Sequence, residues 1–376
     1  MREFRVEVSQ AAMDDLHDRL RRAAWPAEPA TGEPAGVGDA YGVPGARVRE
    51  LARYWLEEFD WRAVEARLNA HPQFLTEIEG ETIHFLHVRS QNPDATPLIL
   101  THGWPGSVME YLDLIEPLRG DFHLVIPSLP GYGFSGPTRG TGWNRYRTAR
   151  AWNELMTRLG YERFGVVGND AGSMIGPEQG RLDPQRVIGV HVTQLYSFPS
   201  GDPADFQDLS EADQRALARL QWFYENKMSF NVLQSQQPQT LAYALHDSPT
   251  GLLAWNAQLF GSTLDPDFVL ANVAIYWFTG TSASAARFYY EEAHAAERPQ
   301  GPTSSPTGLA MFYGDFESIR RFAERDHANI VQWHAYGYPG EGANEPADGD
   351  VGGHYAAHEA TEVLAADIRE FFKTLS

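Results

Sequence analysis

The chain has 376 residues, of which 43% are hydrophobic and 21% are charged, a composition typical of a folded globular protein and not of a disordered one. Its 30 basic and 50 acidic residues give a net charge of −20, which argues against binding to nucleic acid or to an anionic membrane surface. The absence of cysteine excludes disulfides, thiolate nucleophiles and cysteine-ligated metal sites.

Residues 1–80 are predicted to form an N-terminal helical extension. Apolar residues recur at helical spacing over residues 9–25, after Ser9, a residue type that caps helix N-termini. A second helical pattern covers residues 47–69. Because this unit is too small and open to enclose a core of its own, we expect it to pack on the rest of the chain.

Residues 81–199 change to short apolar runs that alternate with helical segments, which is typical of a mostly parallel sheet with helices on both faces. A helix is expected over residues 147–159. Strands are expected at residues 83–88, 97–101, 122–127, 164–168 and 186–193.

Residues 200–305 are predicted to be helical and are rich in aromatic side chains. Residues 306–376 return to the α/β pattern, and their expected elements are strands at 307–312 and 330–335 and a helix over 360–372. The simplest arrangement is one α/β sheet interrupted by a helical insertion that lies over one edge of the sheet as a lid.

The strongest chemical signal surrounds Asp170. The run Gly168-Asn169-Asp170-Ala171-Gly172 follows a predicted strand and precedes a helical stretch, the pattern of a nucleophile elbow, in which small residues permit a sharp turn. An aspartate at the centre forms an ester through its own oxygen, and its natural targets are alkyl electrophiles such as epoxides and alkyl halides. The alternative is structural, because aspartate also caps helix N-termini.

Three further segments complete the pattern. The turn at residues 102–107 follows a predicted strand, and the backbone N–H groups of Trp104 and Ala171 are the expected donors to an oxyanion. His354 follows a pair of glycines and is the candidate general base, and Asp315, just after a predicted strand, is the candidate residue that orients it. The order nucleophile, acid, histidine, with the lid between the first two, is that of the α/β-hydrolase fold, which we therefore predict.

Two other patterns are set aside. Residues 131–136 match the glycine spacing of a dinucleotide-binding loop, but prolines flank them and no helix opens there. His354 and His358 have the spacing of two metal ligands on a helix, but no glutamate follows His354 and no cysteine exists. We therefore expect neither a cofactor nor a metal.

Motifs of one known family extend over nearly the whole chain. They lie at residues 59–62, 68–74, 83–90, 102–107, 168–173, 246–252, 276–289 and 352–359. With this set the chain resembles the epoxide hydrolase family, in the branch with an N-terminal extension that includes the microsomal and juvenile hormone epoxide hydrolases. The resemblance implies that Asp170 is the nucleophile, His354 the base and Asp315 its orienting acid, and that Tyr289 of the lid donates a hydrogen bond to the epoxide oxygen.

The chain departs from that family at two positions. Relatives carry a second lid tyrosine, where this chain has Phe230. Three explanations are open: Tyr289 works alone, another donor (Trp222, Tyr224 or Gln234) replaces the missing tyrosine, or the alignment is shifted at this position. Many relatives place a glutamate at the acid position, and Glu317, two residues after Asp315, is the alternative acid. In the missing lid tyrosine and the aspartate at the acid position, the chain resembles soluble bacterial members of the family from enediyne antibiotic pathways.

The expected function is the hydrolysis of a bulky apolar or aromatic epoxide to a vicinal diol, through an ester of Asp170 that water activated by His354 then hydrolyses. A haloalkane dehalogenase is an alternative with the same chemistry, but it usually has a tryptophan beside the nucleophile, where this chain has Ala171. A second alternative is a non-catalytic binding protein on the same fold, which would be expected to have lost a triad residue.

The expected partners are a small epoxide and water, with no nucleic acid and no membrane, and a homodimer is left open. The N-terminus lacks the apolar core of a signal peptide, and no run approaches the roughly 18 apolar residues of a membrane-spanning helix. We therefore expect a cytoplasmic protein.

Overall fold

A mixed sheet forms the centre of the protein, as seen in a computed structural model that describes residues 1–28, 40–261, 263–297, 299–338 and 353–375. Within these residues the sheet has nine strands in the order β1-β2-β3-β5-β4-β6-β7-β8-β9. All neighbours from β5 to β9 are parallel, and β1, β2 and β3 extend the sheet in antiparallel fashion. The strands are β1 (Arg2–Phe4), β2 (Gln73–Ile78), β3 (Glu81–Val88), β4 (Thr96–Thr101), β5 (Phe122–Pro127), β6 (Phe164–Gly168), β7 (Val187–Val192), β8 (Thr307–Phe312) and β9 (Ile330–Tyr336).

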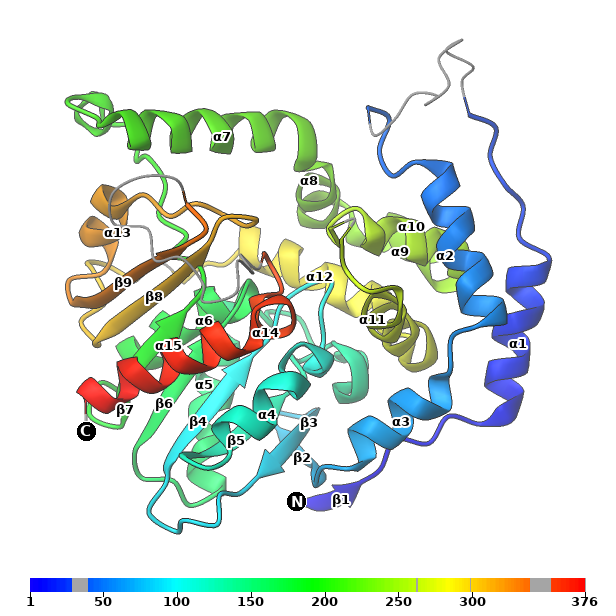
Figure 1. The fold of residues 1–376 in the computed structure, drawn as a ribbon, viewed down its shortest axis with the longest axis horizontal. Helices are drawn as coiled ribbons and strands as arrows, with labels where there is room; N and C mark the ends of the chain where they lie inside the picture. Colours follow the sequence, from blue (N-terminus) through cyan, green and yellow to red (C-terminus); the bar gives the residue numbers. More distant parts are fainter. Residues whose placement is uncertain (29–39, 262, 298, 339–352, 376) are drawn as a thin grey trace.

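The central strands are mostly apolar and buried because helices cover both faces of the sheet. Every residue of β5, β6 and β8 is buried. Figure 1 shows α4 (Leu112–Leu118) and α15 (Thr361–Thr374) in front of the sheet, with α5 (Arg145–Arg158) and α6 (Ala171–Leu182) behind it. The predicted α/β-hydrolase fold with a mostly parallel sheet is confirmed, and the strands expected from residue 83 onward are present.

The N-terminal extension differs from the prediction in two respects. It contains α1 (Gln10–Arg21), α2 (Gly45–Glu57) and α3 (Trp61–Asn69), so the single helix expected over residues 47–69 is two helices. The break occurs at Asp60, whose carboxylate accepts the backbone N–H groups of Arg62 and Ala63 at 2.9 and 3.3 Å and so starts a new helix. The extension is also not purely helical, because β1 and β2 join the main sheet beside β3.

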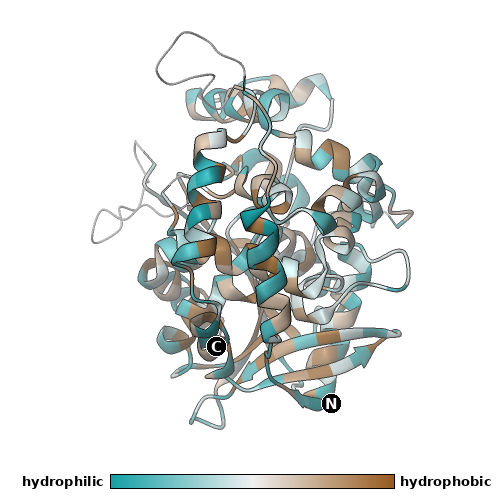
Figure 2. Ribbon diagram, turned by 90° about the vertical axis from the view of Figure 1, so that its right-hand side faces the viewer, coloured by the Kyte–Doolittle hydropathy of each residue, from teal (hydrophilic) through white to brown (hydrophobic). Residues whose placement is uncertain are grey.

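The extension packs against the lid, as expected of a unit without its own core. Tyr54 of α2 donates a hydrogen bond to Asp267 at 3.1 Å, and the ring of Trp61 lies 4.8 Å from that of Phe278. In Figure 2, which looks onto α1 and α2, hydrophilic and hydrophobic residues are interspersed along both helices, and the buried residues recur at helical spacing, with Leu16 and Leu20 in α1 and Leu51 and Trp55 in α2. This is the pattern of helices with one face on the protein and the other in solvent.

The lid is inserted between β7 and β8. Its helices are η3 (Pro203–Phe206), α7 (Glu211–Lys227), α8 (Ser229–Gln236), α9 (Pro238–Asp247), α10 (Pro249–Ala257), α11 (Pro266–Thr279) and α12 (Ser282–Ala293). Figure 1 shows α8, α11 and α12 above the sheet, with α7 crossing the top of the view. The remaining helices are η1 (Val108–Tyr111), η2 (Gly133–Ser135), α13 (Arg320–Asp326) and α14 (Ala356–Glu359). Among the helices of the described ranges, none combines the length and the apolar character that a membrane crossing requires.

Candidate active site

Asp170 lies at a sharp bend between β6 and α6. Its backbone has φ 51° and ψ −114°, a conformation that is costly for a residue with a side chain and that is held in place by the surrounding fold. The elbow packs closely on β4, since a Cβ atom at Gly172 would collide with the carbonyl oxygen of Thr101. The predicted nucleophile elbow is therefore formed, and its central side chain is a carboxylate.

Two backbone N–H groups hold this carboxylate. Oδ1 of Asp170 accepts the N–H of Trp104 at 3.0 Å, and the N–H of Ala171 also donates to the carboxylate. Burial raises the pKa of Asp170 above its ordinary value, and the charge of His354 and the two N–H groups oppose that rise. The two donors expected from the sequence thus converge on one carboxylate.

His354 and Asp315 form a hydrogen-bonded pair. Nδ1 of His354 lies 2.8 Å from Oδ1 of Asp315. Burial alone would lower the pKa of His354, but the charge and hydrogen bond of Asp315, with the charges of Asp170 and Glu110, raise it to about 10. Burial alone would raise the pKa of Asp315, but His354 holds it below its ordinary value. His354 thus pairs with Asp315 and lies in the field of Asp170 and Glu110, and these carboxylates favour its protonated form.

Of the two candidates for the acid, the structure brings Asp315 to His354. Asp315 follows β8 in the turn that starts after Phe312, beside the loop that carries His354. Glu317 is half-buried instead, in the field of Arg219 and Arg215, and burial raises its pKa. Glu317 thus faces a different part of the lid.

Three aromatic rings meet next to the N–H donor at Trp104. The Trp104 ring is stacked on Phe230 of α8, with centroids 5.4 Å apart, and Tyr289 of α12 lies edge-on to both rings at 5.9 and 6.0 Å. Burial and the charge of Asp170 raise the pKa of Tyr289 well above its ordinary value, so this phenol keeps its proton. The lid thus presents a neutral phenol and an apolar ring near Asp170.

The three other donors suggested by the sequence lie in different surroundings. Trp222 and Tyr224 of α7 are 53% and 67% exposed, so the structure does not bring them into the buried group around Asp170. Gln234 of α8 is completely buried, and its Oε1 accepts the indole N–H of Trp255 at 3.0 Å. Its Nε2 group has no hydrogen-bond partner among the residues that the structure describes.

Sequence reasoning missed Tyr196, which follows β7. Its hydroxyl lies within hydrogen-bonding reach of the Asp170 carboxylate, and burial together with the charge of Asp170 raises its pKa well above the ordinary value. Its ring packs on Phe316 with centroids 4.9 Å apart, next to the acid Asp315. No motif marks this tyrosine, because its contact with Asp170 arises only when β7 is placed beside β6.

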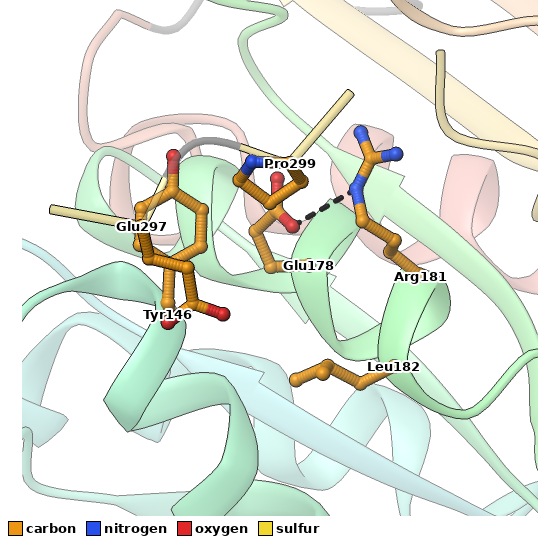
Figure 3. Close-up of a pocket in the computed structure, with 6 residues that line it drawn as sticks. All are labelled: Tyr146, Glu178, Arg181, Leu182, Glu297 and Pro299. Atoms are coloured by element: carbon orange, nitrogen blue, oxygen red, sulfur yellow. Dashed lines mark hydrogen bonds and ion pairs between the residues drawn. The ribbon is translucent and has the colours of Figure 1, made fainter. Parts of the chain in front are cut away.

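A surface hollow of about 330 Å³ lies elsewhere, next to α5 and α6 (Figure 3). In it, Glu178 and Arg181 form an ion pair at 3.0 Å. The hollow is lined by Tyr146, Glu178, Arg181, Leu182, Glu297 and Pro299. No residue of the group around Asp170 lines it, so it is not the reaction site.

The histidine pair with metal-ligand spacing is split between two partners. Nδ1 of His358 lies 2.7 Å from Asp113, whereas His354 faces Asp315. Over the described part of the chain, no group of three or more histidine, aspartate or glutamate side chains could hold a metal ion.

Comparison with known proteins identifies the family. Residues 1–111 match the family described as epoxide hydrolase N terminus, and residues 96–254 match the α/β hydrolase fold. Epoxide hydrolase 1 of Sus scrofa is 31% identical over 425 residues, which cover 100% of this chain and 89% of that protein. A protein of Stigmatella aurantiaca that is provisionally named an epoxide hydrolase is 39% identical, with 99% of this chain and 84% of that protein covered.

Solved structures agree with these relatives. The epoxide hydrolase of Aspergillus niger superposes with a TM-score of 0.85 at 30% identity, covering 100% of this chain and 96% of that chain. The juvenile hormone epoxide hydrolase of Bombyx mori superposes with a TM-score of 0.86 at 24% identity, covering 100% and 94%, a likeness that concerns the fold. With an elbow aspartate, a histidine–aspartate pair and full-length similarity to these proteins, the chain belongs to the epoxide hydrolase family.

Proposed function

We propose that this protein converts an epoxide to a vicinal diol in two steps, with Asp170 as the nucleophile. The proposal is carried by one observation: a carboxylate, and not a hydroxyl, occupies the strained elbow and is held by the N–H groups of Trp104 and Ala171. Such a carboxylate attacks carbon directly, without a base to activate it.

In the first step, Oδ2 of Asp170 attacks a ring carbon of the epoxide and the bond between that carbon and the ring oxygen breaks. The ring oxygen leaves as an alkoxide that takes a proton from Tyr289. An alkoxide is a stronger base than a phenolate, and esterification of Asp170 removes a negative charge that helps to raise the pKa of Tyr289, so the phenol can give up its proton. The products of this step are a hydroxyalkyl ester of Asp170 and a tyrosinate that solvent reprotonates.

In the second step, His354 removes a proton from water and the resulting hydroxide attacks the carbonyl carbon of the ester. Negative charge develops on Oδ1, the oxygen that already accepts the N–H of Trp104, and the N–H of Ala171 donates to the same carboxylate, so the donors are in place before the charge forms. The tetrahedral intermediate collapses as the bond between Cγ and Oδ2 of Asp170 breaks, so that Oδ2 leaves with the alkyl group. His354 then returns its proton to the departing alkoxide oxygen, which gives the diol.

The charge on Asp170 couples the two steps. Before the reaction its negative charge contributes to the raised pKa of His354, which is about 10, so the imidazole is protonated at neutral pH and cannot act as a base. Esterification removes that charge and the pKa of His354 falls. A larger fraction of His354 is therefore neutral in the ester than in the free protein and can act as the base, while Asp315 continues to raise its pKa.

The substrate class follows from the rings around the nucleophile. Of the lid aromatics, Trp222, Phe223, Tyr224, Tyr243 and Tyr290 are exposed, so their number gives no information about the pocket. The argument rests on Trp104, Phe230 and Tyr289, which meet beside Asp170 and favour an apolar or aromatic epoxide. Faster turnover of a small aliphatic epoxide than of an aryl epoxide would contradict this assignment.

The covalent intermediate provides the direct test. His354→Gln, incubated with an aryl epoxide, is expected to gain the mass of one epoxide on the peptide that contains Asp170 and to form almost no diol. Asp170→Ala is expected to gain no mass and to form no diol. An alkylated protein in Asp170→Ala, or no diol from the wild type with any of a varied epoxide panel, would overturn the proposal.

A further inference from the structure

We propose that Gln194 is a positioning residue for this reaction, whose side-chain amide ties the backbone of the nucleophile Asp170 to the carboxylate of the acid Asp315. The inference rests on the proposed function, because the roles of Asp170 and Asp315 come from it. Gln194 lies two residues after the end of β7 and is completely buried. In the proposed mechanism it touches neither the epoxide nor the attacking water.

The amide of Gln194 uses its full hydrogen-bonding capacity. Oε1 accepts the backbone N–H of Asp170 at 2.9 Å and the hydroxyl of Ser173 at 2.8 Å. Nε2 donates to Oδ1 of Asn169 at 2.6 Å and to Oδ2 of Asp315. A flipped amide would set its oxygen against the Asp315 carboxylate and its N–H₂ group against the N–H of Asp170, so one orientation is fixed.

Asn169 extends the connection to the third member of the triad. Its Nδ2 group donates to the carbonyl oxygen of His354 at 2.9 Å and to Oε1 of Glu110 at 2.7 Å. Its Oδ1 accepts from Gln194 and from the hydroxyl of Thr193 at 2.7 Å. Two adjoining amides thus link the nucleophile, the acid and the base, which lie on three separate loops of the sheet.

The contact with Asp315 determines how the histidine is oriented. Oδ1 of this carboxylate faces Nδ1 of His354 at 2.8 Å, and Oδ2 faces Gln194. The N–H of Gln194 therefore fixes the rotation of the carboxylate about its Cβ–Cγ bond and favours its ionised form. Because the histidine acts as a base only in the second step, loss of Gln194 is expected to slow ester hydrolysis more than alkylation.

Two variants separate this role from a merely structural one. Gln194→Leu keeps the volume and removes all four hydrogen bonds. Gln194→Glu keeps the acceptor for Asp170 and Ser173 but replaces the donor to Asp315 with a second carboxyl group. That carboxyl group can donate to Asp315 only while it is protonated. Ester decay in Gln194→Glu should therefore acquire a new pH dependence.

Single-turnover mass spectrometry with an aryl epoxide measures the rise and the decay of the ester. For Gln194→Leu we expect ester decay to slow by about 10²-fold, the size of effect that loss of exact positioning produces, with alkylation slowed by less than about 10-fold. For Gln194→Glu we expect decay close to the wild-type rate at acidic pH and a progressive loss as the pH rises, where the wild type shows none.

The matched control is Gln179→Leu. Gln179 is also completely buried, and its amide donates to Asn153 at 3.1 Å, between α6 and α5. This variant should lose stability without changing the ratio of the two rates.

The possible outcomes are distinct. Equal slowing of alkylation and ester decay in Gln194→Leu would show that the positioning role is wrong. Unchanged ester decay in Gln194→Leu, together with a wild-type pH profile in Gln194→Glu, would show the same. In both cases the proposed function stands. If the wild type forms no ester, the proposed function itself fails. Should Gln194→Leu not fold, the pH profile of Gln194→Glu decides alone.

Discussion

Oδ1 of Asp170 accepts the backbone N–H of Trp104 at 3.0 Å, across 66 residues of sequence. In the proposed mechanism, the oxygen that Trp104 holds in the resting protein is the oxygen that carries negative charge when the ester is hydrolysed. The donors are therefore in place before the charge develops, which is the condition under which such hydrogen bonds accelerate a reaction most. The close approach of the Trp104 turn to the Asp170 side chain also leaves no space for additional atoms between them.

Gly103→Ala is expected to abolish most of the activity. A Cβ atom at this position would collide with the side chain of Asp170, so the nucleophile or the Trp104 turn must shift. We expect alkylation to slow by about 10²-fold or more, measured as the rate of mass gain in single-turnover experiments. Gly120→Ala is the control, since a Cβ there meets nothing within 4 Å. Equal activity of the two variants would contradict the close approach.

Tyr289→Phe tests the proton donor of the first step. Removing the hydroxyl should slow alkylation by about 10²-fold or more and leave ester decay unchanged, because only ring opening produces an alkoxide. Tyr132→Phe is a matched control, since its buried hydroxyl is already bonded to the carbonyl of Ala285 at 3.2 Å. A Tyr289→Phe variant that alkylates at the wild-type rate would exclude this tyrosine as the donor.

The raised pKa of His354 predicts how the two steps depend on pH. In the free protein the pKa is about 10, and esterification of Asp170 removes one of the charges that raise it. Ester decay should therefore increase with pH and level off below pH 10, whereas alkylation, which needs no neutral imidazole, should not increase over that range. Rapid-quench mass spectrometry between about pH 6 and 10 measures both rates. Decay that is constant with pH would contradict the role of His354 as base.

The raised pKa of His354 also predicts how the stability of the folded protein depends on pH. A folded pKa of about 10, above the ordinary 6.5, means that the protonated histidine stabilises the folded state fully below pH 6.5 and that this contribution is lost as the pH rises toward 10. The difference in unfolding free energy between the wild type and His354→Gln should therefore shrink over this range. Urea denaturation at several pH values measures it, and a difference that grows with pH would show that the sign is wrong.

Asp367 anchors the C-terminal helix α15 to the sheet. Its buried carboxylate accepts hydrogen bonds from His191 and His334 at 2.6 Å and from Gln332 and Tyr336 at 2.5 Å. Asp367→Ala leaves these donors without their acceptor and should lower the unfolding free energy by about 3–5 kcal/mol. The covalent chemistry at Asp170 should survive at temperatures where the variant is folded.

Asp121→Ala is the control for that variant. Asp121 also contacts α15, through an ion pair with Arg369 at 3.0 Å, but the Asp121 and Arg369 side chains are 59% and 36% exposed to solvent. An exposed ion pair contributes at most about 1 kcal/mol. If the two variants lost the same stability, burial would not be the reason for the importance of Asp367.

The sequence was sufficient to predict the parallel strands and the elbow, because both are local patterns. Strands β5 and β6 are apolar runs of a few residues, and the glycines around Asp170 stand next to it in the chain. The extra strand β1 could not be predicted, since its three residues are ordered by pairing with β2, about 70 residues away. The break at Asp60 was missed for a different reason, as the apolar spacing continues across it.

The limits at the site have the same origin. Asp170, Asp315 and His354 each follow a strand or a glycine pair, so their order in the chain could indicate a fold and a role. Gln194 and Tyr196 stand in no motif, and their contacts depend on how closely β7 and β8 approach the elbow. Trp222 and Tyr224 have the right residue type, but only the placement of α7 shows that they face solvent.

A single turnover in water enriched in oxygen-18 tests the central claim most directly. With protein in excess over epoxide, hydrolysis of the ester at its carbonyl carbon should place the heavy oxygen in the carboxylate of Asp170, and the first diol released should carry only oxygen-16. Tandem mass spectrometry of the peptide that contains Asp170, with analysis of the diol, measures both. Heavy oxygen in the first diol and none in Asp170 would mean that water attacks the epoxide directly, and the covalent mechanism would be wrong.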